Sequence, residues 1–415
     1  MRSLRVGILL GLRQLQRANI WTTTLIVFVM MITFLNLIAI SGVLVGLIAG
    51  AERAVRAESI GDIIITPKDG EDYILSTPLI RDLLPTIPEI DTYSIRYKAG
   101  GLIEANYQER RSLTGERDTA NITITGIDPI QEDNMSQLSK NVIVGDYLDP
   151  DEEGFILLGA LYTEEYASDY GDFFDTISNV APGDKVRVTI GATTKEFIIK
   201  GIVQSKVDEV SFNSYIPERE FRRLFNRVDQ NANQIVIRTV PSVTEDTVKS
   251  ILIGANIGDY AKIQTYEEGK PKFITDIKNT MNLLGTFIGS IGLLVASITI
   301  FIIIFINALS RRQQIGILKG IGIDRRAIEI AYVLQASVYA LLGSLLGALI
   351  IFGFLIGYFE RNPIQFPFSD GILVAEPMAT FVRFLVLFGV TLVAGFVPAW
   401  MIAKQNTLNA ILGRK

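Results

Sequence analysis

The stretch that decides the fold is Arg311-Arg312-Gln313-Gln314-Ile315-Gly316-Ile317-Leu318-Lys319-Gly320-Ile321-Gly322, which lies between two long apolar segments. In a chain that spans a membrane, a basic run in this position is a short connector exposed to water. Apolar residues recur within it at intervals of three, which predicts a short helix with one apolar stripe made of Ile315, Leu318 and Ile321.

Signals that end helices follow this connector. Gly320 and Gly322 are expected to terminate the short helix, and Asp324 is placed to cap the next one. A short apolar stripe presented to water needs a partner groove that covers it. The alternative is a connector whose isoleucines dip into the lipid headgroups, and the local residues favour neither interpretation.

The composition is too apolar for a soluble protein of this size. Of the 415 residues 49% are hydrophobic, which indicates several membrane spans and a soluble part. Cysteine and histidine are both absent, and this excludes disulfides, Cys/His metal sites, thiol nucleophiles and imidazole bases. The sequence also has no phosphate-binding loop of the Walker type. We therefore expect no catalytic residue, no metal site and no cofactor in this chain.

Charge is distributed unevenly along the chain. Residues 52–280 carry 25 Lys/Arg and 39 Asp/Glu, a net charge of −14. The N-terminal tail, the central connector and the C-terminus together hold 12 basic residues against Asp324 and Glu329. By the positive-inside rule, these three basic segments and both termini are cytoplasmic, and the acidic domain is outside.

Hydropathy and charge together predict four transmembrane helices and a large α/β domain between the first two of them. The predicted segments are 1–19, a cytoplasmic amphipathic helix on the inner leaflet; 20–51, the first span, retained rather than cleaved as a signal peptide; 52–280, the extracytoplasmic domain; 281–308, the second span; 309–329, the cytoplasmic connector; 330–358, the third span; 359–379, an outside loop; 380–402, the fourth span; and 403–415, a cytoplasmic tail.

Within the extracytoplasmic domain, strands and helices alternate at both ends, and strands dominate the middle. Strands are expected at 63–66, 92–105, 121–127, 234–238 and 261–265, and helices at 77–83, 218–225 and 244–252. Residues 183–188 and 196–201 read as a hairpin. The pattern predicts a mixed α/β part with a β-rich subdomain inserted into it. The carboxylates of Asp149, Asp151, Glu152 and Glu153 fit a solvated acidic turn better than a calcium loop.

Small residues recur four apart in three of the predicted spans. They are Gly42, Gly46 and Gly50 in the first span, Gly285 and Gly289 in the second, and Gly343 and Gly347, then Gly353 and Gly357, in the third. This spacing lets helix backbones approach closely, either within one bundle, which we favour, or at a subunit interface. The spans hold no ionisable residue except Arg383 near an outer end, which is expected to reach toward the interface. Asn36, Asn307 and Gln335 are expected to bond between helices.

The layout and two motifs resemble the MacB, LolC/LolE and FtsX type of ABC-transporter permease. One span precedes a large outer domain and three follow it. The connector Gln314-Ile315-Gly316-Ile317-Leu318-Lys319-Gly320-Ile321-Gly322 is similar to the family's E-I-G-I-L-[KR]-A-[LIM]-G, with Gln314 and Gly320 in place of the usual glutamate and alanine. The end of the chain, with Val397-Pro398-Ala399-Trp400-Met401-Ile402-Ala403, Leu408 and Ala410, is similar to P-A-[WR]-x-A-A…P-x-x-A-L, although Asn406-Thr407 replaces the proline region.

This resemblance implies a function. Residues 314–322 would be a coupling helix seated in a separate cytoplasmic ABC ATPase that holds ATP and magnesium, and the outer domain would be a MacB-like core with a porter-like part at about 60–105 and 230–268. Its partners would be a second permease copy or paralogue and the lipid bilayer of the plasma (inner) membrane, the resemblance also allows a periplasmic adaptor, and no nucleic acid is expected. ATP hydrolysis would drive motion outside the membrane, called mechanotransmission, for export of a peptide, drug or lipid, or for lipoprotein release.

Other functions remain open at this stage. One is an FtsX-like regulator of cell-wall hydrolases that transports nothing, although the outer domain is large for that role. Another is a membrane receptor or assembly factor with no ATPase, for which charge substitutions in the connector would be silent. An enzyme acting on envelope polymers would need paired carboxylates, and the sequence nominates no such pair. The substrate and the residues that contact it are unknown from sequence.

Overall fold

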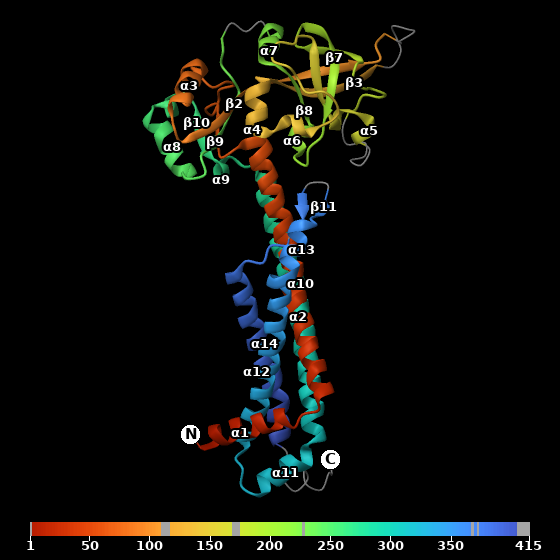
Figure 1. The fold of residues 1–415 in the computed structure, drawn as a ribbon, viewed down its shortest axis with the longest axis vertical. Coiled ribbons are helices and arrows are strands. Elements are labelled where there is room, and N and C mark those ends of the chain that lie inside the picture. The colour runs from red at the N-terminus through yellow and green to blue at the C-terminus, as the bar shows by residue number, and fades with distance from the viewer. Residues whose placement is uncertain are drawn as a thin grey trace. The chain divides into compact units, whose positions relative to one another are not determined.

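The computed structural model describes residues 2–108, 117–167, 175–225, 229–366, 369–371 and 373–404. The chain divides into two compact units. One consists mainly of residues 50–275 and is called the large domain. The other, called the helical unit, is formed mainly by residues 1–49, 276–366 and 370–404. Figure 1 labels the helices and strands of both.

The helical unit is built from long apolar helices. Its elements are α1 (Arg2–Gln16), α2 (Ile20–Val55, which continues into the large domain), α10 (Lys272–Ser310), α11 (Arg312–Gly320), α12 (Arg325–Ile350), the π-helical turn η7 (Ile351–Leu355), α13 (Ile356–Arg361), α14 (Pro377–Lys404) and the short strands β11 (Ile364–Phe366) and β12 (Ser369–Gly371). In the part of the chain that the structure describes, four helical segments are long and apolar enough to cross a membrane: 20–60, 272–310, 325–361 and 377–404. The protein is therefore embedded in a membrane.

The large domain is a mixed α/β structure. Its strands are β1 (Ile63–Thr66), β2 (Ile90–Ala105), β3 (Asp118–Ile127), β4 (Val142–Gly145), β5 (Phe155–Gly159), β6 (Lys185–Ile190), β7 (Thr193–Val203), β8 (Asn213–Pro217), β9 (Gln234–Thr239) and β10 (Lys262–Thr265). Its helices and turns are η1 (Arg56–Ile60), α3 (Thr77–Leu83), η2 (Leu84–Thr86), α4 (Pro129–Ser136), η3 (Leu138–Asn141), η4 (Ala160–Tyr162), α5 (Glu164–Ala167), α6 (Asp208–Ser211), α7 (Glu218–Leu224), α8 (Glu245–Gly254), η6 (Ile257–Asp259) and α9 (Tyr266–Gly269).

The long strand β2 joins the two parts of the domain. The strand order is β10-β1-β9-β2-β3-β8-β5-β7-β4, with β6 paired to both β2 and β7. The first half of β2 pairs with β9, and its second half pairs with β3 and β6. Strands β10, β1, β9 and the start of β2 therefore form the α/β part, and the rest form the inserted β-rich subdomain, as predicted.

Strand β1 shows why three isoleucines follow one another in the sequence. Ile63 and Ile65 belong to the core that includes α3 and α8, whereas Ile64 faces the second core with Val55 and Tyr266. Because successive side chains of a strand point to opposite faces, a strand covered on both faces reads as a continuous apolar run. Three consecutive isoleucines meet this requirement.

Most predicted elements of the large domain are confirmed. The strand at 63–66 and the helix at 77–83 have the predicted bounds, and the hairpin pairs Lys185 with Ile198 and Ile190 with Thr193. The sequence analysis missed α4, β5 and β8. Strand β5 is parallel to β7 and β8 is parallel to β3, so neither belongs to a local hairpin. Short strands that depend on distant partners carry little local signal.

A buried ion pair holds α4 against β2. The guanidinium of Arg96 donates to both carboxylate oxygens of Glu132, with Nε–Oε2 at 2.9 Å and Nη2–Oε1 at 2.6 Å. Ser94 and Ser136 also donate to this carboxylate, each at 2.7 Å. Arg96 is 5% exposed and Glu132 is 1% exposed. Burial alone would raise the pKa of Glu132, but the adjacent Arg96 outweighs it and lowers the pKa.

The same arginine fixes the end of the first long helix. Nη1 of Arg96 donates to the carbonyl oxygen of Ser59 in η1 at 2.5 Å, and the Ser59 hydroxyl donates to Glu209 at 2.6 Å. Lys98 completes this group by pairing with Glu209 at 2.8 Å. Burial would raise the pKa of Glu209, but Lys98, Ser59 and Arg96 lower it to about 2. The π-helical turn that follows α2 is therefore held by side chains of β2 and α6.

Candidate functional site

The candidate site is α11, the short helix of the connector. Nine residues form it, and a helix of this length is marginal in water without tertiary contacts. Its C-terminus is closed by two backbone bonds, Gly322 N to Lys319 O at 3.1 Å and Ile323 N to Leu318 O at 3.0 Å. These form a Schellman motif, in which Gly322 has φ +90°. The Asp324 side chain accepts from Arg326 N at 3.3 Å, so the predicted cap of α12 is confirmed.

One face of α11 packs on the helical unit. Ile315 is only 3% exposed and lies in the same apolar core as Ile328 of α12 and Ile402 of α14. The Lys319 ammonium lies on this face and donates to the carbonyl oxygen of Ala403, at the end of α14, with a distance of 3.0 Å. The helix is therefore fixed to the rest of its unit by both an apolar and a polar contact.

The opposite face of α11 is exposed and partly apolar. Ile317 is 54% exposed and Ile321 is 72% exposed, and the side chains of Gln313 and Gln314 are exposed beside them. At 100° per residue, these four positions lie opposite the buried face that centres on Ile315 and Lys319. We call Gln313, Gln314, Ile317 and Ile321 the exposed face of α11.

The predicted apolar stripe was therefore wrong in part. Ile315 is buried and Leu318 is half-buried, so of the three predicted residues only Ile321 is well exposed. The reason is that the helix has apolar residues on two sides. Spacing alone does not say which side packs against the protein's own spans, and Ile317 was missed because it falls outside the three-residue interval.

The structure places every residue of the predicted coupling helix on this connector. Gln314, Ile315, Gly316, Ile317, Leu318, Lys319 and Gly320 lie within α11, and Ile321 and Gly322 form its C-terminal turn. A side chain added at Gly320 or Gly322 would meet no atom within 4 Å. At Gly322 the positive φ alone favours glycine.

A cationic and aromatic cluster joins the start of α12 to the end of α14. Arg325 bonds to Glu329 at 2.8 Å, and its guanidinium lies 5.7 Å from the ring centre of Trp400. The Lys404 ammonium lies 5.1 Å from the same ring. The contact of Arg325 with Trp400 ties α12 to α14, whereas Lys404 and Trp400 both belong to α14. The first part of the C-terminal motif, residues 397–403, lies in α14 and includes Trp400. Its later members Leu408 and Ala410, and Asn406 and Thr407 in place of the proline region, lie outside the described residues.

The predicted glycines of α12 lie against α2. A Cβ at Gly343 would lie 2.4 Å from the Cβ of Met30, and one at Gly347 would lie 2.7 Å from the ring of Phe34. Both distances are too short for real side chains, so these glycines permit the close approach of the two helices.

The remaining predicted glycines are less tightly packed or lie elsewhere. Gly285 and Gly289 of α10 face α2, where an added Cβ would lie 3.5 Å from Leu44 and 3.2 Å from Leu37. Gly42 instead faces the segment before α14, and its carbonyl accepts from Val374 N at 3.1 Å. Gly46 is buried and Gly50 is half-buried.

Helix α1 packs on α12, a contact that the sequence analysis did not identify. A Cβ at Gly7 would lie 2.8 Å from the carbonyl oxygen of Ala327, and one at Gly11 would lie 2.9 Å from Leu334. Gln335 donates to Gln14 at 2.5 Å, which confirms that Gln335 bonds between helices. Figure 1 shows α1 crossing the lower end of the helical unit. The four-residue spacing of Gly7 and Gly11 was the signal for this contact.

The acidic turn of the large domain pairs with basic side chains of the same domain. Lys200 bonds to Asp149 at 2.8 Å and also to Glu152, and Arg223 bonds to Glu153 at 2.5 Å. The hydrogen bond from Lys200 lowers the pKa of Asp149. Asp149, Glu152 and Glu153 are therefore paired with basic side chains of their own domain.

Comparisons with known proteins place the connector in a family. Residues 286–407 match the FtsX-like permease C-terminal family, a range that contains α11 and most of the last three spans. The macrolide export ATP-binding/permease protein MacB of Campylobacter jejuni is 23% identical over 259 residues, which are 57% of this chain and 38% of that protein. MacB 1 of Yersinia pestis is 29% identical over 135 residues, 32% of this chain and 19% of that protein. The matched part is thus under two fifths of these relatives' length.

Two solved structures resemble the chain at low scores. The periplasmic region of MacB from Actinobacillus actinomycetemcomitans has a TM-score of 0.35 at 14% identity and covers 51% of this chain and 92% of its own. The extracellular domain of the noncanonic ABC-type transporter YknZ from Gram-positive bacteria has a TM-score of 0.31 at 13% identity, with coverages of 49% and 97%. The family match over residues 286–407 and the MacB relatives, together with four apolar helices and the α/β domain between the first two, make the chain similar to ABC-transporter permeases of the MacB and FtsX type.

Proposed function

We propose that this chain is the permease subunit of an ABC exporter, and that the exposed face of α11 docks into a separate cytoplasmic ATPase. The observation that supports this is the division of α11 into two faces. Ile315 and Lys319 hold one face to the helical unit, while Ile317 and Ile321 present apolar area on the other. An amphipathic helix that fits a partner groove uses such an arrangement.

The partner ATPase would hold ATP and Mg²⁺, and this chain would receive the resulting motion. A force on α11 would pass to α14 through Lys319 and to α12 through the apolar core around Ile315. In the large domain, Arg96 would help to carry the motion by holding the π-helical turn after α2. This is mechanotransmission, in which the substrate is handled outside the spans.

We place the protein in the plasma (inner) membrane with both termini in the cytoplasm, because the basic residues are concentrated in the N-terminal tail, the connector and the C-terminus. The permease would act as a dimer with a second copy or a paralogue. Its cargo would be a peptide, a drug or a lipid, or a lipoprotein to be released. The names of the MacB relatives, which specify macrolide export, support export over an FtsX-like regulatory role.

The test measures ATP hydrolysis by a candidate partner ABC ATPase from the same organism, with the permease reconstituted in lipid nanodiscs. We expect the permease to stimulate or tightly control hydrolysis, and Ile317→Asp to abolish this effect. The buried aspartate would leave a charge unpaired in the docking groove. Ile253→Asp is the matched control, because Ile253 is an isoleucine of similar exposure, 50% against 54%, in the large domain.

Two results would contradict parts of this proposal. If Ile317→Asp leaves ATPase binding and control unchanged, α11 is not the coupling helix. If the wild-type permease has no effect at any ratio of the two proteins, a receptor or assembly factor without an ATPase becomes the better interpretation. Ile315→Asp is unsuitable for this test, since it would disrupt the core of the helical unit.

A further inference from the structure

A cavity of about 410 Å³ lies between three helices of the helical unit. Helix α10 lines it from Met281 to Leu293, a length of ~18 Å at 1.5 Å per residue. Helices α2 and α14 form the other walls, and Val382 and Val386 of α14, which are 49% and 45% exposed, lie at its open side. This volume is within the range of small-molecule sites.

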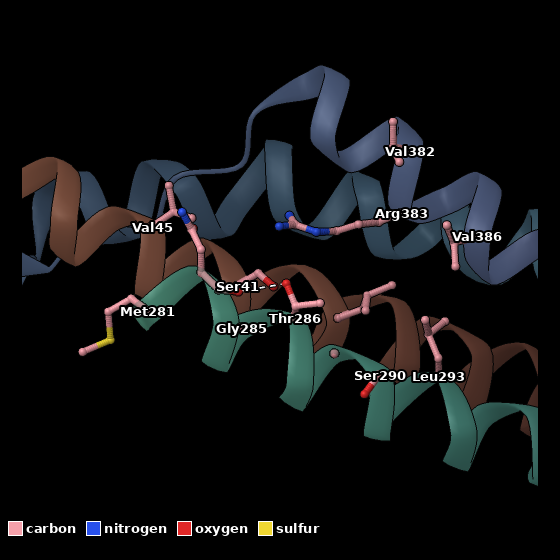
Figure 2. Close-up of a pocket in the computed structure, with 13 residues that line it drawn as sticks. Ser41, Val45, Met281, Gly285, Thr286, Ser290, Leu293, Val382, Arg383 and Val386 are labelled. Atoms are coloured by element: carbon pink, nitrogen blue, oxygen red, sulfur yellow. Dashed lines mark hydrogen bonds between the residues drawn. The ribbon is translucent and has the colours of Figure 1, made fainter. Parts of the chain in front are cut away.

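The polar groups of the cavity are donors grouped around one arginine. Figure 2 shows the side chain of Arg383 extending across the cavity toward Ser41 and Thr286, while Leu293 and Val386 lie farther along the spans. The hydroxyl hydrogens of Thr286 and Ser290 are already donated to carbonyls of their own helix. Arg383, Ser41 and Asn282 therefore supply the donors that face a ligand.

The charge of Arg383 has no counter-ion in the described part of the chain, where no carboxylate acts on its guanidinium. The sequence also has no aspartate or glutamate within 20–49, 281–308, 330–358 or 380–402. A second copy of this chain thus brings no carboxylate at the depth of the spans. Because a half-buried guanidinium in a membrane is costly without a partner, a negative charge supplied by another molecule would stabilise Arg383.

We propose that this cavity binds a membrane amphiphile, with its anionic headgroup on Arg383 and its hydrocarbon along Leu37, Leu293 and Val386. A phosphate or carboxylate oxygen accepts from the guanidinium and from Ser41 or Asn282. The apolar walls of the cavity cover the part of the amphiphile's hydrocarbon chain that is nearest to its headgroup. The cavity thereby gives the permease a preference for anionic over zwitterionic lipids at one end of its spans. This inference does not depend on the docking of α11.

The test counts lipids retained by the purified full-length chain in native mass spectrometry from detergent. Dioleoylphosphatidylglycerol is the anionic probe, dioleoylphosphatidylcholine is the zwitterionic one, and glycerol phosphate tests the headgroup without its chains. We expect Arg383→Gln to weaken phosphatidylglycerol retention by about 10- to 100-fold, the value of a charge-assisted hydrogen bond, and Arg383→Lys to preserve most of it. Arg361→Gln is the charge-matched control, because Arg361 is exposed at the end of α13.

A second pair of variants tests the site by filling it. Val386→Trp should block retention, and Leu385→Trp, at an adjacent residue with 49% exposure that does not line the cavity, should leave it intact. Undiminished phosphatidylglycerol retention in both Arg383→Gln and Val386→Trp would overturn the proposal. So would equal competition by glycerol phosphate alone, which would make the site one for a free anion. Loss of dimerisation in Val386→Trp with unchanged lipid retention would assign the cavity to a contact between copies.

Discussion

Removal of Arg96 tests the reasoning about the large domain most directly. In Arg96→Leu, the carboxylate of Glu132, which is 1% exposed, keeps its two serine donors but loses its only bidentate cationic partner. A buried pair broken on one side costs about 3–5 kcal/mol of unfolding free energy. For a domain of this size, that corresponds to a fall in melting temperature of about 6–20 °C.

The pH dependence of this deficit follows from Glu132. In the wild type its pKa lies below the ordinary 4.5, so its contribution is present above that pH and is lost as the pH falls. In Arg96→Leu, burial without a cation raises the pKa of Glu132, and the protonated carboxyl is tolerated. The variant is therefore relieved as the pH falls toward 4.5, the wild type loses this contribution as the pH falls below 4.5, and the difference in stability between them narrows on acidification from pH 7.

Differential scanning calorimetry of the full-length chain in detergent measures this difference between pH 7 and pH 4. The double variant Arg96→Leu/Glu132→Leu should be closer to the wild type than Arg96→Leu is, because an apolar pair leaves no buried charge. A deficit of less than about 1 kcal/mol, as for a surface pair, or one that does not change with pH, would refute the assignment of this pair as a buried ion pair.

Two further predictions concern packing and pH. Gly343→Ala should lower the melting temperature of the purified chain, because its methyl group would meet α2 at a distance that forces the helices apart, and Gly353→Ala, which meets no atom within 4 Å, should leave it unchanged. The Glu209 carboxylate has its pKa lowered to about 2 from the ordinary value of 4.5. Its contribution to stability is therefore present above pH 4.5 and is lost as the pH falls toward 2. Lys98→Met should flatten this acid-side slope in calorimetric scans, and an unchanged slope would show that another carboxylate causes it.

The sequence was sufficient for the features that follow from local chemistry. Long apolar runs, the turn at Gly322 and the cap at Asp324 are determined by a few neighbouring residues, and each was predicted. The ion pair of Arg96 and Glu132 could not be predicted, because the two residues are 36 positions apart and meet only through the register of β2 against α4.

The buried face of α11 was also beyond reach, for a related reason. When a short helix has apolar residues on two sides, the side that is covered depends on spans that are distant in sequence. Ile402 of α14 and Ile328 of α12 decide it by packing with Ile315. The cavity at Arg383 had a partial signal, a lone cation in an apolar helix, but its hydroxyl-bearing walls come from two other helices.

The two faces of α11 also bear on how such permeases diverge. Ile315 and Lys319 contact the protein's own spans, and Gly322 adopts a backbone conformation that favours glycine. Substitutions at these three positions would therefore destabilise the permease whichever ATPase it binds. Gln313, Gln314, Ile317 and Ile321 are free of those constraints. Under the docking proposal, these four positions determine which of several ATPases in a cell the permease binds. Exchanging these four residues between paralogous permeases would then make a permease bind a different ATPase without changing its membrane-spanning structure.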